Sequence, residues 1–483
     1  MNEKSKKVHV FRDDVLGELD AVGIAERIRN KEITSKEAVT AAIERAKEAN
    51  PAINAIVTEL YDRALNVSDE VNEGAFSGVP MFLKDMVHVK GVPVHHGTRA
   101  YNDTVQASTT TDPIVKQIFA QGFVSLGMST MPEFGFTAST EFPEGDATRN
   151  PWNTDHSAGG SSGGSSALVA AGVVPIAHAA DGGGSIRIPA GACGLVGLKA
   201  SRGRLLKAAK FKRQPVEIAI DGMVSRSVRD TAHFYAEAEK FYRNPKLPSI
   251  GLVEGPSNLK YRIGFTGDSV KGMAADDETK YGLKQTAELL ESMGHEVVQF
   301  ELPVKDRFVD DFANLWSVGG FYFERYGKKV FGDVYEPEDL SGLTKGLSEH
   351  FRQNKAKTMA SIVRLRNSFR QYRRMFKRSG LDMILTPTTA HVPPAIGYLS
   401  MTLPYEDLFD RIQNWACFTP YHNATGGPSI SLPVQHYTEP DLPMGMLLSA
   451  NHGQEAMLLD IAYQLEAAKP WKKIWDSKKG NVQ

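Results

Sequence analysis

The segment GGSSGGSSALVAAGVVPIAHAADGGGSIRIP, residues 159–189, holds two clusters of glycine and serine separated by an apolar stretch. Flexible linkers are also rich in these residues, but a linker does not alternate with a run of Ala and Val or end in Ile-Arg-Ile-Pro. We therefore expect tightly turning α/β structure here, within a core of about residues 78–203.

Ser185 stands directly after three glycines. Consecutive glycines let the backbone curve tightly, so successive N–H groups can converge on one point and stabilise an oxyanion beside the serine Oγ. A nucleophilic serine also needs a proton acceptor. His178, seven residues earlier, is the nearest histidine, and we expect it to pack or hydrogen-bond locally.

Lys84 is the other candidate base, because it follows an apolar run that predicts a buried strand. Burial favours the uncharged form of a lysine and lowers its pKa. An uncharged lysine accepts a proton from a serine directly or through a second serine. A lysine at a strand end is more often structural or exposed, but here the two Gly/Ser clusters favour catalysis.

Two other interpretations of the glycines are weaker. A phosphate-binding loop would show GxxxxGK[ST] or GxGxxG, and neither occurs in residues 159–189. Residues 159–163 match GxSxG literally, but that motif should directly follow a strand, and the polar residues 153–158 predict a loop.

Several motifs together resemble the amidase signature family, over about residues 20–470. Ser161 and Ser185 are 24 residues apart, the spacing that this family uses. The matching motifs are Gly78-Val79-Pro80 with Lys84-Asp85 three residues later, Gly159-Gly160-Ser161-Ser162-Gly163-Gly164-Ser165, Asp181-Gly182-Gly183-Gly184-Ser185-Ile186-Arg187-Ile188-Pro189-Ala190, and residues 148–153, 193–199, 225–230, 385–388 and 427–433.

The resemblance implies roles for the site residues. Ser185 would be the acyl-accepting nucleophile, Ser161 a bridging serine on a cis peptide bond, and Lys84 the general base and then the acid. The oxyanion hole would consist of the N–H groups of Gly182, Gly183, Gly184 and Ser185. The family's fold is a single α/β domain, a large mixed β-sheet covered by α-helices, with no metal or organic cofactor.

The sequence also departs from the family pattern beside these residues. Ala179-Ala180 precede Asp181 where Gly-Thr or Gly-Ser is usual, and Ala200-Ser201 follow Lys199 where Pro-Thr is usual. These differences concern local hydrogen bonds and substrate choice rather than the reaction class.

Within the family, residues 175–178 and 186–189 look most like the hydrolases of 6-aminohexanoate cyclic dimer and related nylon oligomers. Trp316 falls in a segment that lines the pocket there, where a smaller residue is typical, although it could instead be a core aromatic. The loop Phe134-Gly135-Phe136 is expected to form another wall.

Two alternatives remain open. A glutamine-hydrolysing subunit of a tRNA amidotransferase would usually have Gln where Ile188 stands. A non-catalytic scaffold protein would have lost parts of the site, whereas Lys84, Ser161 and Ser185 are all present.

The 483 residues include 41% apolar residues, enough for a large core. With 56 Lys and Arg against 57 Asp and Glu, no charge excess points to nucleic acid or an anionic membrane. Two cysteines, no signal-like apolar segment and no run of about 18 apolar residues favour the cytoplasm. The expected partner is a small amide substrate, and a homo-oligomer is compatible with the sequence.

We expect residues 1–14 to form a flexible tail and residues 15–483 the amidase domain. The pattern Thr34-Ser35-Lys36-Glu37 predicts a capped helix that stops at Asn50-Pro51. Further predicted elements are a helix around residues 24–28, strands at 261–265, 295–300 and 381–385, a helix at 276–293 and helical structure over 305–380, whose arginines we interpret as a solvated face.

Overall fold

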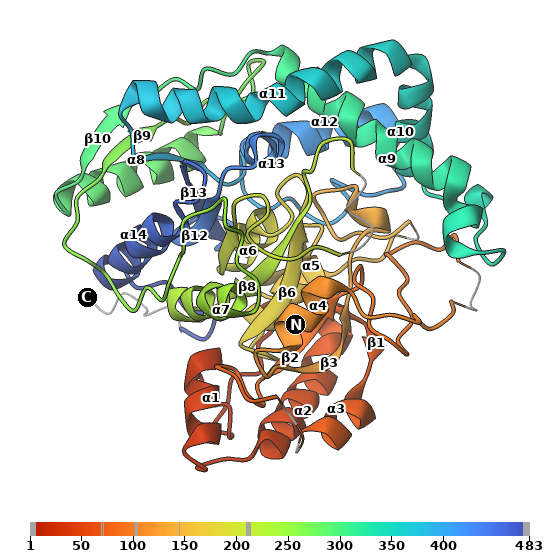
Figure 1. The fold of residues 1–483 in the computed structure, drawn as a ribbon, viewed down its shortest axis with the longest axis vertical. Coiled ribbons are helices and arrows are strands. Elements are labelled where there is room, and N and C mark those ends of the chain that lie inside the picture. The colour runs from red at the N-terminus through yellow and green to blue at the C-terminus, as the bar shows by residue number, and fades with distance from the viewer. Residues whose placement is uncertain are drawn as a thin grey trace, which may run out of the picture.

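The computed structural model describes residues 6–68, 70, 72–101, 105–143, 145–208 and 214–476. Its central feature is an eight-stranded sheet in the order β10-β9-β11-β13-β12-β7-β8-β6 (Figure 1). β10, β9 and β11 pair in parallel and the other neighbours are antiparallel, so the sheet is mixed. The strands are β6 (Ile176–Asp181), β7 (Val196–Lys199), β8 (Ile220–Ser225), β9 (Arg262–Phe265), β10 (Glu296–Gln299), β11 (Met383–Pro387), β12 (Ser429–His436) and β13 (Pro443–Ala450).

Two smaller sheets hold further motif residues, among them Lys84 at the end of β2. The first has the order β1-β3-β2, and the second consists of β4 and β5. Every residue of β2 is buried, and β2 packs against β6 of the large sheet. The strands are β1 (Ile56–Glu59), β2 (Pro80–Lys84), β3 (Val124–Ser129), β4 (Arg149–Asn150) and β5 (Asn153–Ser157).

Helices cover the sheets, which confirms the predicted α/β class. Figure 1 shows α1 to α3 beside the three-stranded sheet and α9 to α12 at the opposite end of the molecule. Within the described ranges, no helix combines the length and the apolar character that crossing a membrane requires. The helices are α1 (Ala21–Arg29), α2 (Ser35–Ile53), α3 (Tyr61–Val67), α4 (Pro113–Phe119), α5 (Gly163–Ala170), α6 (Arg187–Cys193), α7 (Val228–Phe241), α8 (Asp277–Ser292), α9 (Arg307–Phe331), α10 (Gly342–Gln353), α11 (Lys355–Ser379), α12 (Tyr405–Trp415), α13 (Pro420–Thr425) and α14 (Glu455–Ala468), with 3₁₀ turns η1 (Glu133–Gly135) and η3 (Pro337–Asp339).

The second helix begins as predicted but ends later. Thr34 caps α2 in a capping box, yet the predicted stop at Asn50-Pro51 is wrong, because the helix continues through Pro51 to Ile53. Its end is set instead by Asn54, which adopts a left-handed conformation at φ 49° and donates its N–H to Asn50 O at 2.8 Å. The strand, helix and strand predicted between residues 261 and 300 are present as β9, α8 and β10.

The start of the described chain is attached to the domain. Val8 N donates to Pro151 O and Val10 N donates to Ala171 O, both at 2.8 Å. Residues 6–14, predicted as part of a loose tail, therefore lie against the domain, because their backbone groups find partners there. Residues 1–5 of that predicted tail lie outside the described residues.

Candidate active site

Lys84 is the last residue of β2, and its side chain is 1% exposed. Its Nζ lies 2.7 Å from Ser161 Oγ and 2.9 Å from Ser162 Oγ, with Ala180 O at 3.4 Å. The sheet contact between β2 and β6 thus places a buried amine beside two hydroxyls from the first Gly/Ser cluster.

Ser161 is 3% exposed, and its peptide bond with Gly160 is cis, as the resemblance implies. The polar segment before it is not the predicted loop but β5, which is held by pairing with β4. Three residues still separate the end of β5 from Ser161, and α5 begins only at Gly163. The direct strand-to-serine turn of a GxSxG elbow is therefore not formed.

The second Gly/Ser cluster forms a turn between β6 and α6, with Ser185 7% exposed. Its carbonyls are engaged, because Thr419 Oγ1 donates to Gly183 O at 2.6 Å and Ile188 N donates to Gly184 O at 2.7 Å. Among the described residues, no hydrogen bond uses the N–H groups of Gly182, Gly183, Gly184 or Ser185 as donors. Of these four residues, Gly183 and Ser185 line the cavity described below.

The structure brings Lys84 and Ser161 together but does not join Ser185 to them by a hydrogen bond. No described residue is hydrogen-bonded to the Ser185 hydroxyl. The second contact that a bridging Ser161 implies, between the two serine hydroxyls, is thus not made in this conformation.

A buried ion pair braces the turn that carries Ser185. Arg187 donates to both carboxylate oxygens of Asp181, with Nε–Oδ2 and Nη2–Oδ1 distances of 2.8 Å. Ile186 N and Asn423 Nδ2 also donate to that carboxylate, at 3.1 and 2.8 Å. Burial opposes ionisation, but the Arg187 guanidinium holds the pKa of Asp181 well below its usual range. Both ends of the turn are fixed by this charge-assisted network.

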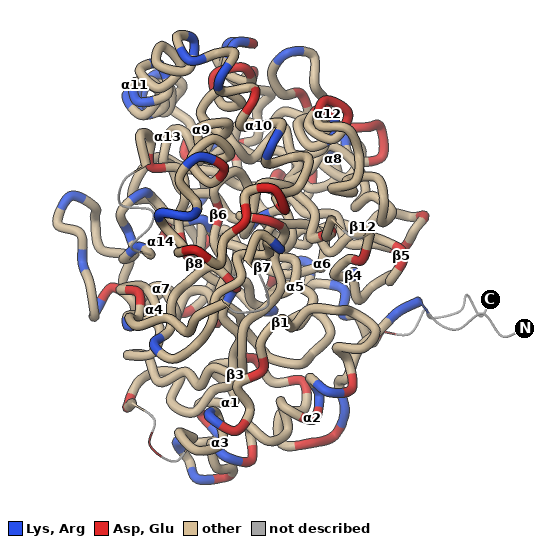
Figure 2. Tube along the Cα trace, turned by 90° about the vertical axis from the view of Figure 1, so that its right-hand side faces the viewer, with Lys and Arg blue, Asp and Glu red and all other residues tan. Residues whose placement is uncertain are grey.

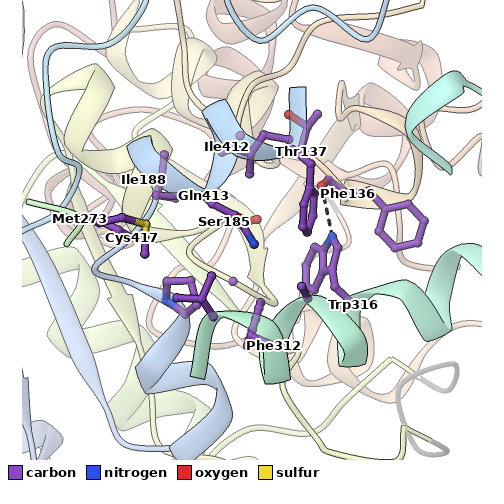
Figure 3. A pocket seen from close by; sticks show the side chains of 18 of the residues that line it. Phe136, Thr137, Ser185, Ile188, Met273, Phe312, Trp316, Ile412, Gln413 and Cys417 are labelled. Atoms are coloured by element: carbon purple, nitrogen blue, oxygen red, sulfur yellow. Dashed lines mark hydrogen bonds between the residues drawn. The ribbon is translucent and has the colours of Figure 1, made fainter. Parts of the chain in front are cut away.

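A cavity of about 90 Å³ lies beside Ser185 (Figure 3). In α9, Phe312 and Trp316 stack with ring centroids 5.6 Å apart, and Trp316 meets Phe136 edge-on at 5.9 Å. Trp316 Nε1 donates to the Phe136 carbonyl at 3.2 Å, so its polar atom is already engaged. The lining residues, none of them charged, are Gly135, Phe136, Thr137, Ala138, Gly160, Gly183, Ser185, Ile188, Val270, Met273, Phe308, Val309, Phe312, Ala313, Trp316, Phe409, Ile412, Gln413, Ala416, Cys417 and Pro420.

The residues of the predicted loop Phe134-Gly135-Phe136 do not all line the cavity. Gly135 and Phe136 line the cavity, and a Cβ on Gly135 would lie 2.9 Å from Ser161 Oγ. Phe134 is not among the described residues that line the cavity, so its role as a wall stays a prediction. Its ring is held elsewhere, stacked on Phe323 with centroids 3.9 Å apart.

Several site residues were not predicted. Ser162 Oγ is hydrogen-bonded to Lys84 Nζ. Its place in the repeated Gly-Ser run was the sequence feature that could have indicated this role. Phe312 lies one helical turn before Trp316 on α9, a spacing that was visible but unassigned. Thr419, which orients the Gly183 carbonyl, carried no signal in the sequence.

His178 packs locally, as predicted. It is fully buried, its Nδ1 accepts from Lys84 N at 3.3 Å, and its Nε2 lies 3.2 Å from Asp221 Oδ1. In the part of the chain that the structure describes, no group of three or more His, Cys, Asp or Glu side chains is placed to hold a metal ion.

The sequence of this chain matches the Amidase family over residues 37–459. The chain therefore belongs to the amidase family, and the protein is an amide-hydrolysing enzyme. It is 45% identical over 471 residues to AmiC of Mycobacterium tuberculosis (strain ATCC 25618 / H37Rv), covering 97% of this chain and 98% of that protein.

The chain is also similar to 6-aminohexanoate cyclic dimer hydrolases, in sequence and in structure. The 6-aminohexanoate-cyclic-dimer hydrolase of Paenarthrobacter ureafaciens is 32% identical over 477 residues, covering 94% of this chain and 95% of that one. A solved structure of 6-aminohexanoate cyclic dimer hydrolase matches with a TM-score of 0.85 and 29% identity, over 95% of this chain and 98% of the other. These similarities confirm the predicted family and fold.

Proposed function

We propose that this amidase cleaves its substrate through a triad of Lys84, Ser161 and Ser185. The observation that carries the proposal is the 2.7 Å contact between Lys84 Nζ and Ser161 Oγ, made by an amine that is 1% exposed. Burial favours the uncharged amine, because an ammonium group would lose its hydration. An uncharged amine in contact with a hydroxyl can act as its proton acceptor.

In the proposed acylation step, Ser185 Oγ attacks the carbonyl carbon of the amide. Its proton passes to Ser161 Oγ, whose own proton passes to Lys84 Nζ. The carbonyl oxygen becomes an oxyanion. Hydrogen bonds from the N–H groups of Gly182, Gly183, Gly184 and Ser185 would stabilise it.

Collapse of this intermediate breaks the C–N bond and leaves an acyl group on Ser185. The proton on Lys84 returns through Ser161 to the departing amine. A water molecule then attacks the acyl carbon, giving up its proton along the same route, and Ser185 leaves with a proton from Ser161.

The mechanism requires the Ser185 hydroxyl to contact Ser161 when substrate is bound. We expect a rotation about the Cα–Cβ bond of Ser185 to form this contact, since catalytic hydrogen bonds often tighten only in the substrate complex.

We further propose an uncharged substrate with a small apolar acyl group. The cavity of about 90 Å³ offers no described charged side chain to a substrate, and burying an unpaired charge is costly. For comparison, a cavity of about 150 Å³ accommodates benzene. A 6-aminohexanoate cyclic dimer meets the requirement for neutrality, because both ends of each unit are condensed into amides, but opening its ring leaves an acyl chain larger than this cavity holds. Linear oligomers carry charged ends and do not meet the requirement for neutrality.

The cavity argues against a glutamine-hydrolysing subunit, and the contacts of Lys84 argue against a non-catalytic scaffold protein. A glutamine substrate presents an ammonium and a carboxylate, for which the described lining has no charged partner. A scaffold protein would gain nothing from a buried amine in contact with two hydroxyls.

Two further parts of the proposal are a cytoplasmic location, which the free, buried Cys193 and Cys417 support, and the absence of a cofactor.

A panel of purified amides tests this function and its substrate class. We expect turnover of neutral aliphatic amides and little or none of glutamine or of linear zwitterionic oligomers. Ammonia or amine release from glutamine at a rate matching the neutral amides would overturn the substrate proposal, and failure on every amide would overturn the activity itself.

Replacing Trp316 by Ala should enlarge the cavity and shift the preference towards bulkier acyl groups. Differences in apolar fit are worth about 1–3 kcal/mol, so kcat/KM for an aryl amide should rise at least about tenfold relative to an acetyl amide. The ratio between two substrates is the readout, because a loss of folded protein lowers both rates equally.

The matched control is Tyr322→Ala on the same helix, since Tyr322 is 45% exposed and does not line the cavity. It should leave the ratio unchanged. An unaltered ratio in Trp316→Ala would show that this ring does not limit the acyl group.

A further inference from the structure

A second cavity lies outside the substrate pocket, between residues 300–308 and one face of α11. Its volume is about 830 Å³. The residues that α11 contributes recur at intervals of three and four, which is the spacing of a single helix face. They are Arg364, Leu365, Asn367, Ser368, Gln371, Arg374, Met375, Arg378 and Ser379.

The charge of this cleft is strongly positive. Five cationic side chains line it against two acidic ones, Glu301 and Asp311, a net formal charge of +3 in a chain whose total is −1. The cations come from two segments that are far apart in the sequence, 305–307 and 364–378. They are Lys305, Arg307, Arg364, Arg374 and Arg378.

Within the described ranges, one of these cations forms an ion pair. Arg364 donates to Asp311, with an Nε–Oδ2 distance of 2.8 Å. The other four form no ion pair with any residue in the described ranges. Like charges held in one cleft repel one another, so an anion placed between them would relieve that repulsion.

The simpler interpretation is that α11 presents arginines to water on all sides, and Figure 2 does show Lys and Arg along this helix. That interpretation accounts for Arg370, which does not line the cleft. It does not account for Lys305 and Arg307, which lie outside α11 and line the same cleft as Arg374 and Arg378.

We propose that this cleft binds a small polyanion through phosphoryl or carboxylate oxygens. Guanidinium groups bind such oxygens through pairs of parallel N–H donors, and the amides of Asn367 and Gln371 add neutral donors. The site is separate from the Ser185 cavity, although Phe308 forms part of the wall of both. It does not depend on the triad.

Calorimetric titration of the full chain with inorganic pyrophosphate tests the proposal, with citrate as a parallel arm. We expect saturable binding of one anion per chain, weakening as salt is added. If pyrophosphate binds and citrate does not, the ligand is phosphoryl. If citrate binds as tightly, carboxylates share the site.

The double variant Arg374→Glu, Arg378→Glu should weaken this binding at least about tenfold, since two favourable charges become repulsive. Both side chains are exposed, so the fold should persist. Arg370→Glu is the matched control on the same helix and should change the affinity by no more than about twofold.

The absence of saturable binding to the wild-type chain would overturn the proposal. An equal loss in Arg370→Glu would also overturn it, because it would show a general effect of charge rather than a site. Should the double variant fold poorly, Arg374→Gln alone must still weaken binding relative to Arg370→Gln.

Discussion

The Ser185→Ala variant should lose amide turnover by about 10⁶-fold, the size of the loss when a serine hydrolase loses its nucleophile. The reason is that the methyl side chain of the variant has no oxygen with which to form the acyl-enzyme. Initial rates with a neutral aliphatic amide provide the measurement, with protein purified free of host amidases.

Ser166→Ala is a suitable control, because Ser166 is buried in the other Gly/Ser cluster and its hydroxyl has no partner among the described residues. It should retain activity close to that of the wild-type chain. Wild-type rates in Ser185→Ala would remove Ser185 from the mechanism.

Replacing Lys84 by Met should lower kcat/KM by about 10³- to 10⁴-fold. The methionine keeps the volume and apolar stem of the side chain but cannot accept a proton. In the wild-type chain the rate should fall as the pH is lowered, because a protonated amine can no longer take the serine proton. The variant should lack that fall.

Two serines contact Lys84, and replacing each in turn distinguishes a serine that relays a proton from one that only supports the structure. Their hydroxyls lie 2.7 and 2.9 Å from Nζ, so geometry alone treats them alike. Ser161→Ala should lose orders of magnitude in rate, whereas Ser162→Ala should lose about tenfold or less. Equal effects of the two changes would contradict the bridging role of Ser161, and a wild-type chain equally active from about pH 5 to 9 would contradict a lysine base.

The sequence predicted the separate parts of the proposed reaction centre, because the signals for each part are local. Runs of Gly and Ser dictate tight backbone turns, and the apolar residues before Lys84 indicated a buried strand. β2 is indeed buried throughout. The contact between Lys84 and Ser161, 77 residues apart in the sequence, followed from a family resemblance and not from any spacing.

The walls of the cavity could not be predicted in the same way. They come from α9, α12 and the segment around residues 416–420, where an apolar side chain facing the cavity and one facing the core have the same pattern. Phe134 and Phe136 illustrate this, since they are two residues apart and only Phe136 faces the cavity. The end of α2 was also predicted wrongly at Pro51. The helix ends at Ile53, where Asn54 adopts a left-handed conformation and donates its N–H to Asn50 O.

Covalent labelling with a fluorophosphonate tests the account most directly, since the reagent modifies only a serine whose oxygen is activated. Mass spectrometry of the digested protein should find one adduct per chain, on the peptide that contains Ser185. The rate of labelling should fall steeply in Lys84→Met. An adduct on another serine, or no adduct on a folded protein that hydrolyses amides, would contradict the triad.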